Sequence, residues 1–260
     1  MTRVAVDGQR WLDRGTGAPT LVFLHYFSGA AASWQWVMRS LKSDLRCVAI
    51  DLPGFGQAPP LPTPTLKNYS DFVWEALSAL GVDDFVLVGH SMGAKIALQV
   101  AARAGGEELR QVILVAPSPP TPEPMPNEER QRLLNRHPSE ENAATTVENS
   151  TRLSLNAEQR SLAIHTHTIA ADSAWRWWLQ TGMHHSIADQ LDKIRVPVIV
   201  IASPDDPVIP FEVVQREVVD RVPHAHLIEF SDAGHLMPFE APERLAQVIR
   251  EQVRSGAIAS

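Results

Sequence analysis

The chain contains a single cysteine, Cys47, among its 260 residues, so an intramolecular disulfide is excluded. Cys47 lies in the apolar run 46–50, where a small core side chain is far more common than a nucleophile. No apolar run is long enough to cross a membrane, and residues 1–8 lack the apolar core of a signal peptide. We therefore expect a cytoplasmic protein that does not bind membranes.

Positive charge is also scarce. The chain has 23 Lys and Arg against 30 Asp and Glu, a formal net charge of −7, and no basic run. Nucleic acids and anionic membranes bind clustered basic side chains, so no nucleic-acid partner is expected. The length suits one α/β domain with an insertion, large enough to bury a full core. None of these features indicates an oligomeric state.

Short apolar runs alternate with amphipathic stretches along most of the chain. This alternation predicts an α/β fold, with a mainly parallel, doubly wound sheet and helices on both faces. A hairpin is expected at 3–13, with Asp7 and Gly8 as its turn. The other strands are expected at 21–25, 46–51, 84–89, 111–116, 196–202 and 225–230, and the helices between them at 33–42, 66–80, 92–104, 210–221 and 239–253.

The pentapeptide Gly89-His90-Ser91-Met92-Gly93 stands between a strand-like run and a helix-like run. A G-x-S-x-G motif in this setting is typical of a nucleophile elbow, a sharp turn that projects the serine hydroxyl from the sheet edge. Side chains at the two glycines would collide with the neighbouring strand or helix. Ser91 is therefore the expected nucleophile, and His90 is expected to point away from it and to pack.

Candidates for the other two members of a catalytic triad follow in chain order. The strand expected at 196–202 is followed by a loop with two aspartates, Asp205 and Asp206. The next expected strand is followed by a loop that holds His235. Because the carboxyl ends of parallel strands share one edge of a sheet, an aspartate and His235 can meet Ser91 there.

With these motifs the sequence resembles the α/β-hydrolase superfamily over nearly its whole length. The further segments that match the family's pattern are 21–25, 51–56, and 232–235 together with 239–242. The family pattern Gly-x-x-Asp-x-x-x-Pro maps onto 203–210, which makes Asp206 the expected triad acid and Pro210 the end of the motif. Asp205 follows a proline and favours a hydrogen-bonded turn.

The resemblance also implies an oxyanion hole. In the family the relevant loop commonly reads His-Gly-X, and X supplies a backbone N–H; here it reads His25-Tyr26-Phe27. The N–H groups of Phe27 and Met92 are therefore the expected donors. Tyr26 replaces the usual glycine and either fills a gap, which we favour, or places its phenol near the substrate, so we count it among the candidate substrate-binding residues. His25 is expected to be a hydrogen-bonded scaffold residue.

Six prolines within 117–126 exclude a helix or a central strand and predict a stiff, extended connector. α/β hydrolases insert a cap at this point, so the resemblance implies a helical cap at 118–190 between two parts of the core, 1–117 and 191–260. The helix-like segments expected within the cap are 127–136, 139–151, 156–171 and 173–181.

The last of these helices carries an apolar stripe. Ser173 is the expected N-cap and Gly182 the expected terminator. Trp175, Trp178 and Leu179 share one helical face, which either lines the substrate pocket or docks the cap on the core. We name the two tryptophans as candidate substrate-binding residues, with an apolar or aromatic group as their expected ligand.

The remaining histidines of the cap do not form a metal-binding pattern. His165 and His167 are two residues apart and point to nearly opposite sides of a helix, and no Cys or Glu cluster accompanies them. We expect these two residues, together with His184 and His185, to lie on the surface, and we expect no metal.

The expected reaction is acyl transfer to water through an acyl-serine, without a cofactor. His235 would act as base and then as acid, and Asp206 would orient it. A small, apolar carboxylic ester, thioester or lactone is the expected substrate. A C–C bond hydrolase, a cofactor-free perhydrolase, or a binding protein or receptor with little turnover stays an alternative. Aspartate-nucleophile relatives are disfavoured because position 91 is serine.

Overall fold

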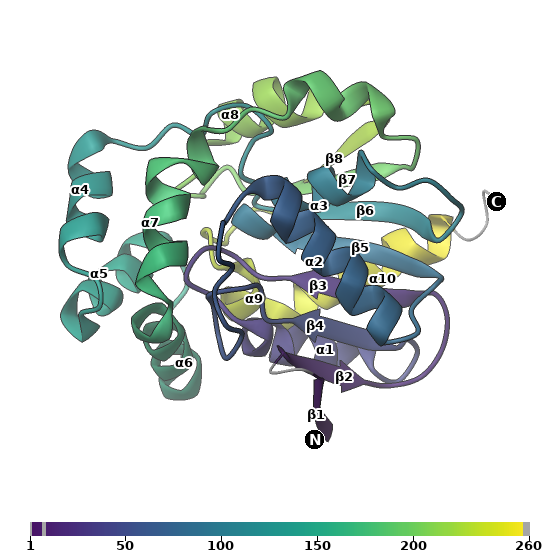
Figure 1. Ribbon diagram of the computed structural model, residues 1–260, viewed down its shortest axis with the longest axis horizontal. Coiled ribbons are helices and arrows are strands. Elements are labelled where there is room, and N and C mark those ends of the chain that lie inside the picture. The colour runs from purple at the N-terminus through teal and green to yellow at the C-terminus, as the bar shows by residue number, and fades with distance from the viewer. Residues whose placement is uncertain (1, 7–8, 257–260) are drawn as a thin grey trace.

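A computed structural model of the chain describes residues 2–6 and 9–256. Its centre is an eight-stranded sheet with the order β1-β2-β4-β3-β5-β6-β7-β8 (Figure 1). β1 and β2 pair antiparallel with their neighbours, and the other strands run parallel. The strands are β1 (Thr2–Val6), β2 (Gln9–Arg14), β3 (Thr20–Leu24), β4 (Cys47–Ile50), β5 (Phe85–His90), β6 (Leu109–Val115), β7 (Val198–Ala202) and β8 (Ala225–Glu229).

These strands confirm the predicted α/β fold with a mainly parallel sheet. The predicted amino-terminal hairpin is present as the antiparallel pair β1 and β2. Its expected turn residues, Asp7 and Gly8, lie outside the described residues. Cys47 is buried in β4, and burial raises the pKa of its thiol to about 12. The thiol therefore stays protonated and serves as a core side chain.

Helices cover both faces of the sheet and bury a separate apolar core on each. One face packs under α1 (Gln35–Leu41) and α10 (Pro242–Gly256), and the other under α2 (Leu66–Ala79), α3 (Met92–Ala101) and α8 (Phe211–Val214). α8 continues as a π-helical turn, Gln215–Val219. The helix expected at 239–253 is divided into α9 (Met237–Glu240) and α10, because Pro242 has no N–H with which to continue the first helix.

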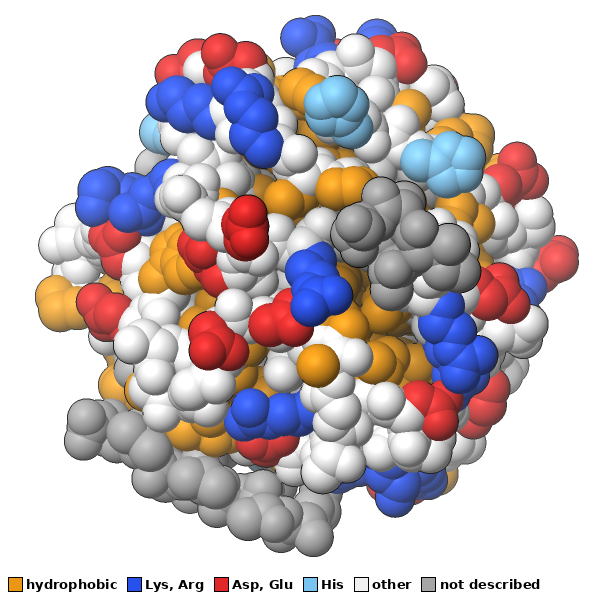
Figure 2. Space-filling model, turned by 90° about the vertical axis from the view of Figure 1, so that its right-hand side faces the viewer, with side chains coloured by type: hydrophobic (Ala, Val, Ile, Leu, Met, Phe, Trp, Pro, Cys, Tyr) orange, Lys and Arg blue, Asp and Glu red, His pale blue; other side chains and the backbone are white. Residues whose placement is uncertain are grey.

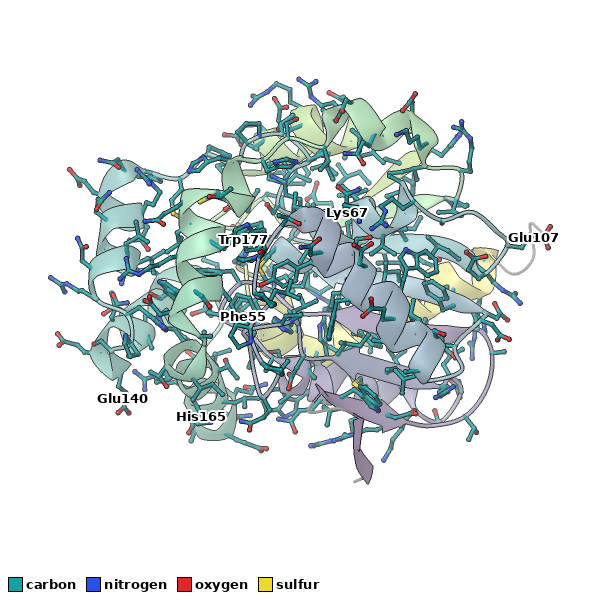
Figure 3. The ribbon with its side chains drawn as sticks, in the orientation of Figure 1. Phe55, Lys67, Glu107, Glu140, His165 and Trp177 are labelled. Carbon is teal, nitrogen blue, oxygen red and sulfur yellow. The ribbon has the colours of Figure 1, made fainter. Side chains whose placement is uncertain are left out.

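Four further helices lie together beside the carboxyl edge of the sheet (Figure 1). These inserted helices are α4 (Asn127–Asn135), α5 (Glu140–Ser150), α6 (Ala157–Ile169) and α7 (Asp172–Gln180). The Trp177 ring of α7 stacks on Tyr69 of α2, with 4.7 Å between ring centroids, and lies between the inserted helices and the core in Figure 3. This stack docks α7 on the sheet's helical cover.

The prediction that Ser173 caps α7 is wrong. The helix begins at Asp172, and its N-cap is Ala171, which provides no side-chain cap. The Ala171 N–H donates to the Gly54 carbonyl at 2.7 Å, so a tertiary contact sets where the helix starts. Asp172 adds a favourable negative charge to the first turn. Gly182 follows the helix as expected, and a Cβ there would lie 2.8 Å from the Trp178 ring.

Figure 2 shows the face of the molecule that lies on the right in Figure 1, away from the inserted helices. Basic and acidic side chains are interspersed over this face. Among the described residues, no helix combines the length and the apolarity that a membrane crossing needs.

Candidate active site

Ser91 occupies a strained turn between β5 and α3. Its backbone angles are φ 52° and ψ −115°, a conformation that costs a non-glycine residue about 1–3 kcal/mol. A Cβ at Gly89 would lie 2.5 Å from the Gly93 carbonyl oxygen, and a Cβ at Gly93 would lie 2.6 Å from the carbonyl oxygens of Leu24 and His25. Both glycines are therefore required by close packing, as the motif predicts.

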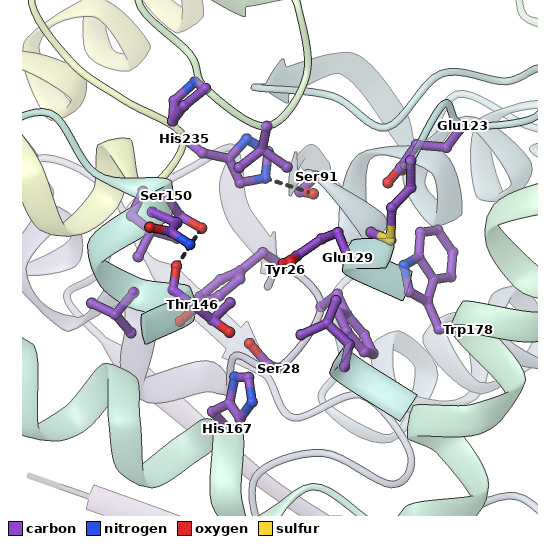
Figure 4. A pocket seen from close by; sticks show the side chains of 18 of the residues that line it. Tyr26, Ser28, Ser91, Glu123, Glu129, Thr146, Ser150, His167, Trp178 and His235 are labelled. Atoms are coloured by element: carbon purple, nitrogen blue, oxygen red, sulfur yellow. Dashed lines mark hydrogen bonds between the residues drawn. The ribbon is translucent and has the colours of Figure 1, made fainter. Parts of the chain in front are cut away.

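The structure brings Ser91, His235 and Asp206 into one hydrogen-bonded chain. Ser91 Oγ lies 2.9 Å from His235 Nε2 (Figure 4). On the other side of the ring, His235 Nδ1 lies 2.8 Å from Asp206 Oδ2. The second carboxylate oxygen of Asp206 accepts the N–H groups of Val208 at 2.7 Å and Ile209 at 3.0 Å. These two bonds hold the carboxylate so that its other oxygen faces the imidazole.

The three hydrogen-bonded side chains are buried: Ser91, His235 and Asp206 are each at most 9% exposed. Their burial affects the pKa of the imidazole. Burial by itself lowers the pKa of His235, but the charge and hydrogen bond of Asp206 outweigh it, so the pKa is raised above its ordinary value. In a site with little water such a charge-assisted hydrogen bond is strengthened. The imidazole can therefore take up a proton from the Ser91 hydroxyl.

Asp205 faces away from the imidazole. Its carboxylate accepts the N–H of Asp232 at 3.0 Å, and its own N–H donates to Ser203 Oγ at 3.0 Å. It thus forms the turn that the sequence predicts and links the loop after β7 to the loop that carries His235.

The side chain of His25 braces the loop after β3 by two hydrogen bonds. His25 Nδ1 donates to the Tyr26 carbonyl at 2.8 Å, and His25 Nε2 accepts the Leu52 N–H at 3.0 Å. Burial lowers the pKa of His25 to about 4, which keeps the ring neutral. Within the described residues, the N–H groups of Phe27 and Met92 have no hydrogen-bond partner in the protein.

Tyr26 both packs and lines the pocket. Its ring lies against His90 and Phe239, with centroids 5.1 and 6.1 Å away. A Cβ at Gly29 would lie 2.7 Å from the Tyr26 ring, so glycine three residues later makes room for the aromatic side chain. Burial raises the pKa of the phenol to about 12, and the ring also borders the cavity beside Ser91.

The side chains of His90 and Glu240 hold the loop of His235. His90 Nε2 lies 2.8 Å from the His235 carbonyl oxygen, so the side chain reaches this loop, not Ser91. Glu240 Oε2 accepts three backbone N–H groups at 2.7–2.9 Å, those of Arg152, Leu153 and Gly234. Glu240 therefore ties the segment after α5 to the loop that carries the histidine.

A cavity of about 230 Å³ opens beside Ser91 and His235 (Figure 4). Trp178 lines it, but Trp175 does not. Trp175 is instead buried among the inserted helices, where its Nε1–H donates to the Leu133 carbonyl and its ring stacks on His137, 4.1 Å between centroids. Of the two tryptophans expected in the pocket, only Trp178 lines the cavity. Trp175 lies on the same helical face but packs against neighbouring side chains.

The cavity also contains polar residues that the sequence analysis missed. Glu123, from the proline-rich connector, is buried and lines the cavity, and burial raises the pKa of its carboxyl. Nearby, Lys95 Nζ donates to the carbonyls of Thr121 and Met183, and burial lowers its pKa to about 8. Proline spacing reveals an extended connector but not which of its side chains turns inward.

The expectation that all four cap histidines lie on the surface is wrong for His167. His165 lies exposed on the outside of α6 (Figure 3), whereas His167, two residues later, is 1% exposed and lines the cavity. The two residues do lie on opposite sides of the helix, as expected, but the side that carries His167 faces the cavity and not the solvent. In the described part of the chain, no group of three or more His, Cys, Asp or Glu residues is arranged to hold a metal ion.

Comparison with known proteins agrees with this geometry. The model of the alpha/beta hydrolase family matches residues 21–248. The chain belongs to the alpha/beta hydrolase family. Among curated relatives in this family, the uncharacterized hydrolase YugF of Bacillus subtilis is 26% identical over 250 residues, covering 92% of this chain and 91% of that protein.

A partial match extends to a larger protein. The dihydrolipoyllysine-residue acetyltransferase component of an acetoin cleaving system from Cupriavidus necator is 37% identical over 115 residues, 43% of this chain. The match covers only 30% of that relative's length.

Solved structures of other hydrolases superpose over nearly the whole chain. An esterase from Exiguobacterium antarcticum matches with a TM-score of 0.86 at 20% identity, covering 97% of this chain and 99% of that one. A thermophilic esterase from Thermogutta terrifontis matches at 0.82 and 25% identity, covering 98% and 99%. A meta-cleavage product hydrolase matches at 0.78 and 20% identity, covering 98% of each chain. The two matches at 20% identity show the fold alone.

The two adjacent aspartates give a matched test of the site. We expect Asp206→Asn to lower kcat by about a thousand- to ten-thousand-fold, because the amide cannot stabilise a charged imidazole. Asp205→Asn keeps an acceptor for the Asp232 N–H and should stay within a few-fold of the unmodified protein. The kcat of both variants is measured by steady-state hydrolysis of p-nitrophenyl esters. A larger loss of kcat in Asp205→Asn than in Asp206→Asn would contradict this arrangement.

Proposed function

We propose that the protein is a serine hydrolase that cleaves a small carboxylic ester, thioester or lactone through an acyl-Ser91 intermediate. The observation that supports it most is the buried chain of hydrogen bonds from Ser91 through His235 to Asp206. His235 Nε2 accepts the hydroxyl proton as Ser91 Oγ attacks the carbonyl carbon, and then donates it to the leaving group. Water, activated by the same nitrogen, releases the acid and frees Ser91.

The oxyanion formed in each step requires donors that are already in position. The N–H groups of Phe27, which lines the cavity, and of Met92, which directly follows Ser91, are proposed as these donors. Met92 is the first residue of α3, so the positive end of the helix dipole adds to the stabilisation of negative charge. Apart from substrate and water, this mechanism uses only side chains and backbone groups of the protein and requires no metal or cofactor.

We further propose that residues 118–190 act as a cap that shapes the substrate pocket. Most of the cavity lining comes from this segment and from the loops after β3, β7 and β8. Apolar side chains such as Met125, Leu133 and Trp178 dominate the walls and favour an apolar substrate body. The likeness to a structure described as a thermophilic esterase, at 25% identity, supports an ester as substrate.

Replacement of the nucleophile tests the proposed chemistry. Ser91→Ala should abolish hydrolysis of short p-nitrophenyl esters, since loss of the nucleophile in another serine hydrolase costs about a million-fold in kcat. The exposed Ser154→Ala is the matched control and should keep full activity. Circular dichroism should show both variants folded. A folded Ser91→Ala protein with a tenth of the original activity would contradict the mechanism.

Trp178 and Trp175 separate pocket contact from packing. Trp178→Ala should lower kcat/KM for a bulky aromatic ester by about tenfold or more, roughly 1.4 kcal/mol, and change the value for an acetyl ester much less. Trp175→Ala removes a buried ring outside the cavity and should mainly lower the melting temperature. Trp178→Phe provides a milder variant. Equal losses on both esters would show that Trp178 only packs.

A further inference from the structure

His167 is a buried polar side chain without a polar partner. Its ring is 1% exposed, and neither Nδ1 nor Nε2 has a hydrogen-bond partner among the described residues. Burying such a group without a hydrogen bond costs free energy, and buried imidazoles are ordinarily paired. The ring lines the same cavity as Ser91 and His235 and lies across it from them in Figure 4. Its missing partner can therefore come from a molecule in the cavity.

The surroundings of His167 determine which hydrogen bonds it offers. The ring meets Trp175 edge to face, with centroids 4.6 Å apart. Burial, followed by the neighbouring His137 and Arg132, lowers its pKa to about 3. The ring is therefore neutral and offers one N–H donor and one acceptor nitrogen. Arg132 is occupied elsewhere, by Glu129, Asn142 and Thr146.

The charges around the cavity narrow the chemistry of the missing partner. Two carboxyl side chains, Glu123 and Glu129, line the cavity, and none of its lining residues is Lys or Arg. The cavity lining therefore offers no cationic side chain that would bind an anionic group. A neutral group that both donates and accepts, such as a hydroxyl or an amide, fits the imidazole. Ser28 lies beside His167 on this wall and adds a hydroxyl group to the polar end of the cavity (Figure 4).

We propose that His167 is a specificity-determining residue that binds a neutral hydroxyl or amide group at the end of the substrate remote from the bond that is cleaved. The walls of the cavity are mainly apolar, so we expect an apolar spacer between the carbonyl of the substrate and this polar end. The inference rests on the proposed function in one respect, because attachment to Ser91 fixes the carbonyl end of the substrate.

The test compares esters that differ only at the remote end. Each pair has a terminal methyl in one member and a hydroxyl in the other, as in p-nitrophenyl heptanoate and p-nitrophenyl 6-hydroxyhexanoate. Shorter and longer pairs cover the unknown spacer length, and pairs such as hexyl acetate and 5-hydroxypentyl acetate place the polar end in the alcohol part. The mono-p-nitrophenyl ester of adipic acid, with a terminal carboxylate, serves as the anionic probe.

His167→Phe removes both nitrogens but keeps an aromatic ring, and His165→Phe on the exposed side of α6 is the matched control. In the unmodified protein, the hydroxyl member of at least one pair should have a kcat/KM about three- to tenfold higher than its methyl partner, a gain typical of one neutral hydrogen bond. The carboxylate member should be the poorest of its set. His167→Phe should remove the preference, and His165→Phe should retain it.

Thermal unfolding provides a readout that distinguishes recognition from structure. Because His167 has no partner in the protein, His167→Phe should leave the melting temperature unchanged or raise it. Absence of a preference in every pair of the unmodified protein, or the same preference in His167→Phe, would overturn the proposal. A lower melting temperature together with an unchanged preference would assign His167 a structural role only.

Binding by Ser91→Ala separates this proposal from the proposed function. Calorimetric titration of that variant with the intact esters measures the preference without turnover. If the unmodified protein hydrolyses no ester, the proposed function fails, yet a hydroxyl preference that His167→Phe removes in the Ser91→Ala background still supports the recognition site. Equal affinity for both members of every pair overturns it.

Discussion

The close approach of the β5–α3 turn to the end of β3 is the constraint on which the rest of the site depends. Gly93 lies so near the carbonyls of Leu24 and His25 that no side chain fits between them. This contact holds Ser91 at a φ of 52° and places the first N–H groups of α3 beside the loop after β3. The nucleophile and both proposed oxyanion donors therefore share one rigid contact.

The segment inserted after β6 is joined to this centre at several points. The His235 N–H donates to the Ser150 carbonyl at the end of α5, and the Glu240 carboxylate accepts the N–H groups of Arg152 and Leu153. On the other side, the buried ammonium of Lys95 lies between the carbonyls of Thr121 and Met183, which precede α4 and follow α7. The inserted helices are thus anchored where they leave and re-enter the core.

The features that sequence could predict are those governed by local backbone rules. The elbow glycines, the strands and the chain order of Ser91, Asp206 and His235 follow from periodicity and motif spacing, and the structure brings these three side chains together. Asp205 could be separated from Asp206 because the α/β-hydrolase pattern that the sequence resembles, which ends at Pro210, sets the register of the loop.

The features that sequence could not predict depend on how the inserted helices pack. Periodicity identifies the face that carries Trp175 and Trp178 but not which part of it borders a cavity. Likewise, His167 lies opposite an exposed His165, and its burial is visible only once α6 is placed. Ser173 has the composition of an N-cap, yet a hydrogen bond from Ala171 to Gly54 determines the helix start. Glu240 accepts backbone N–H groups, which every residue except proline has, so no pattern of side chains in the sequence could reveal its partners.

Covalent labelling tests the central claim, that Ser91 is activated by its hydrogen-bonded partners, most directly. The protein is treated with a fluorophosphonate and digested with trypsin, and the modified peptide is located by mass spectrometry. The account predicts one adduct, on Ser91 in the peptide 68–95, and a much slower reaction in the Asp206→Asn variant. Labelling of another serine, or labelling of Ser91 at an equal rate in Asp206→Asn, would contradict it.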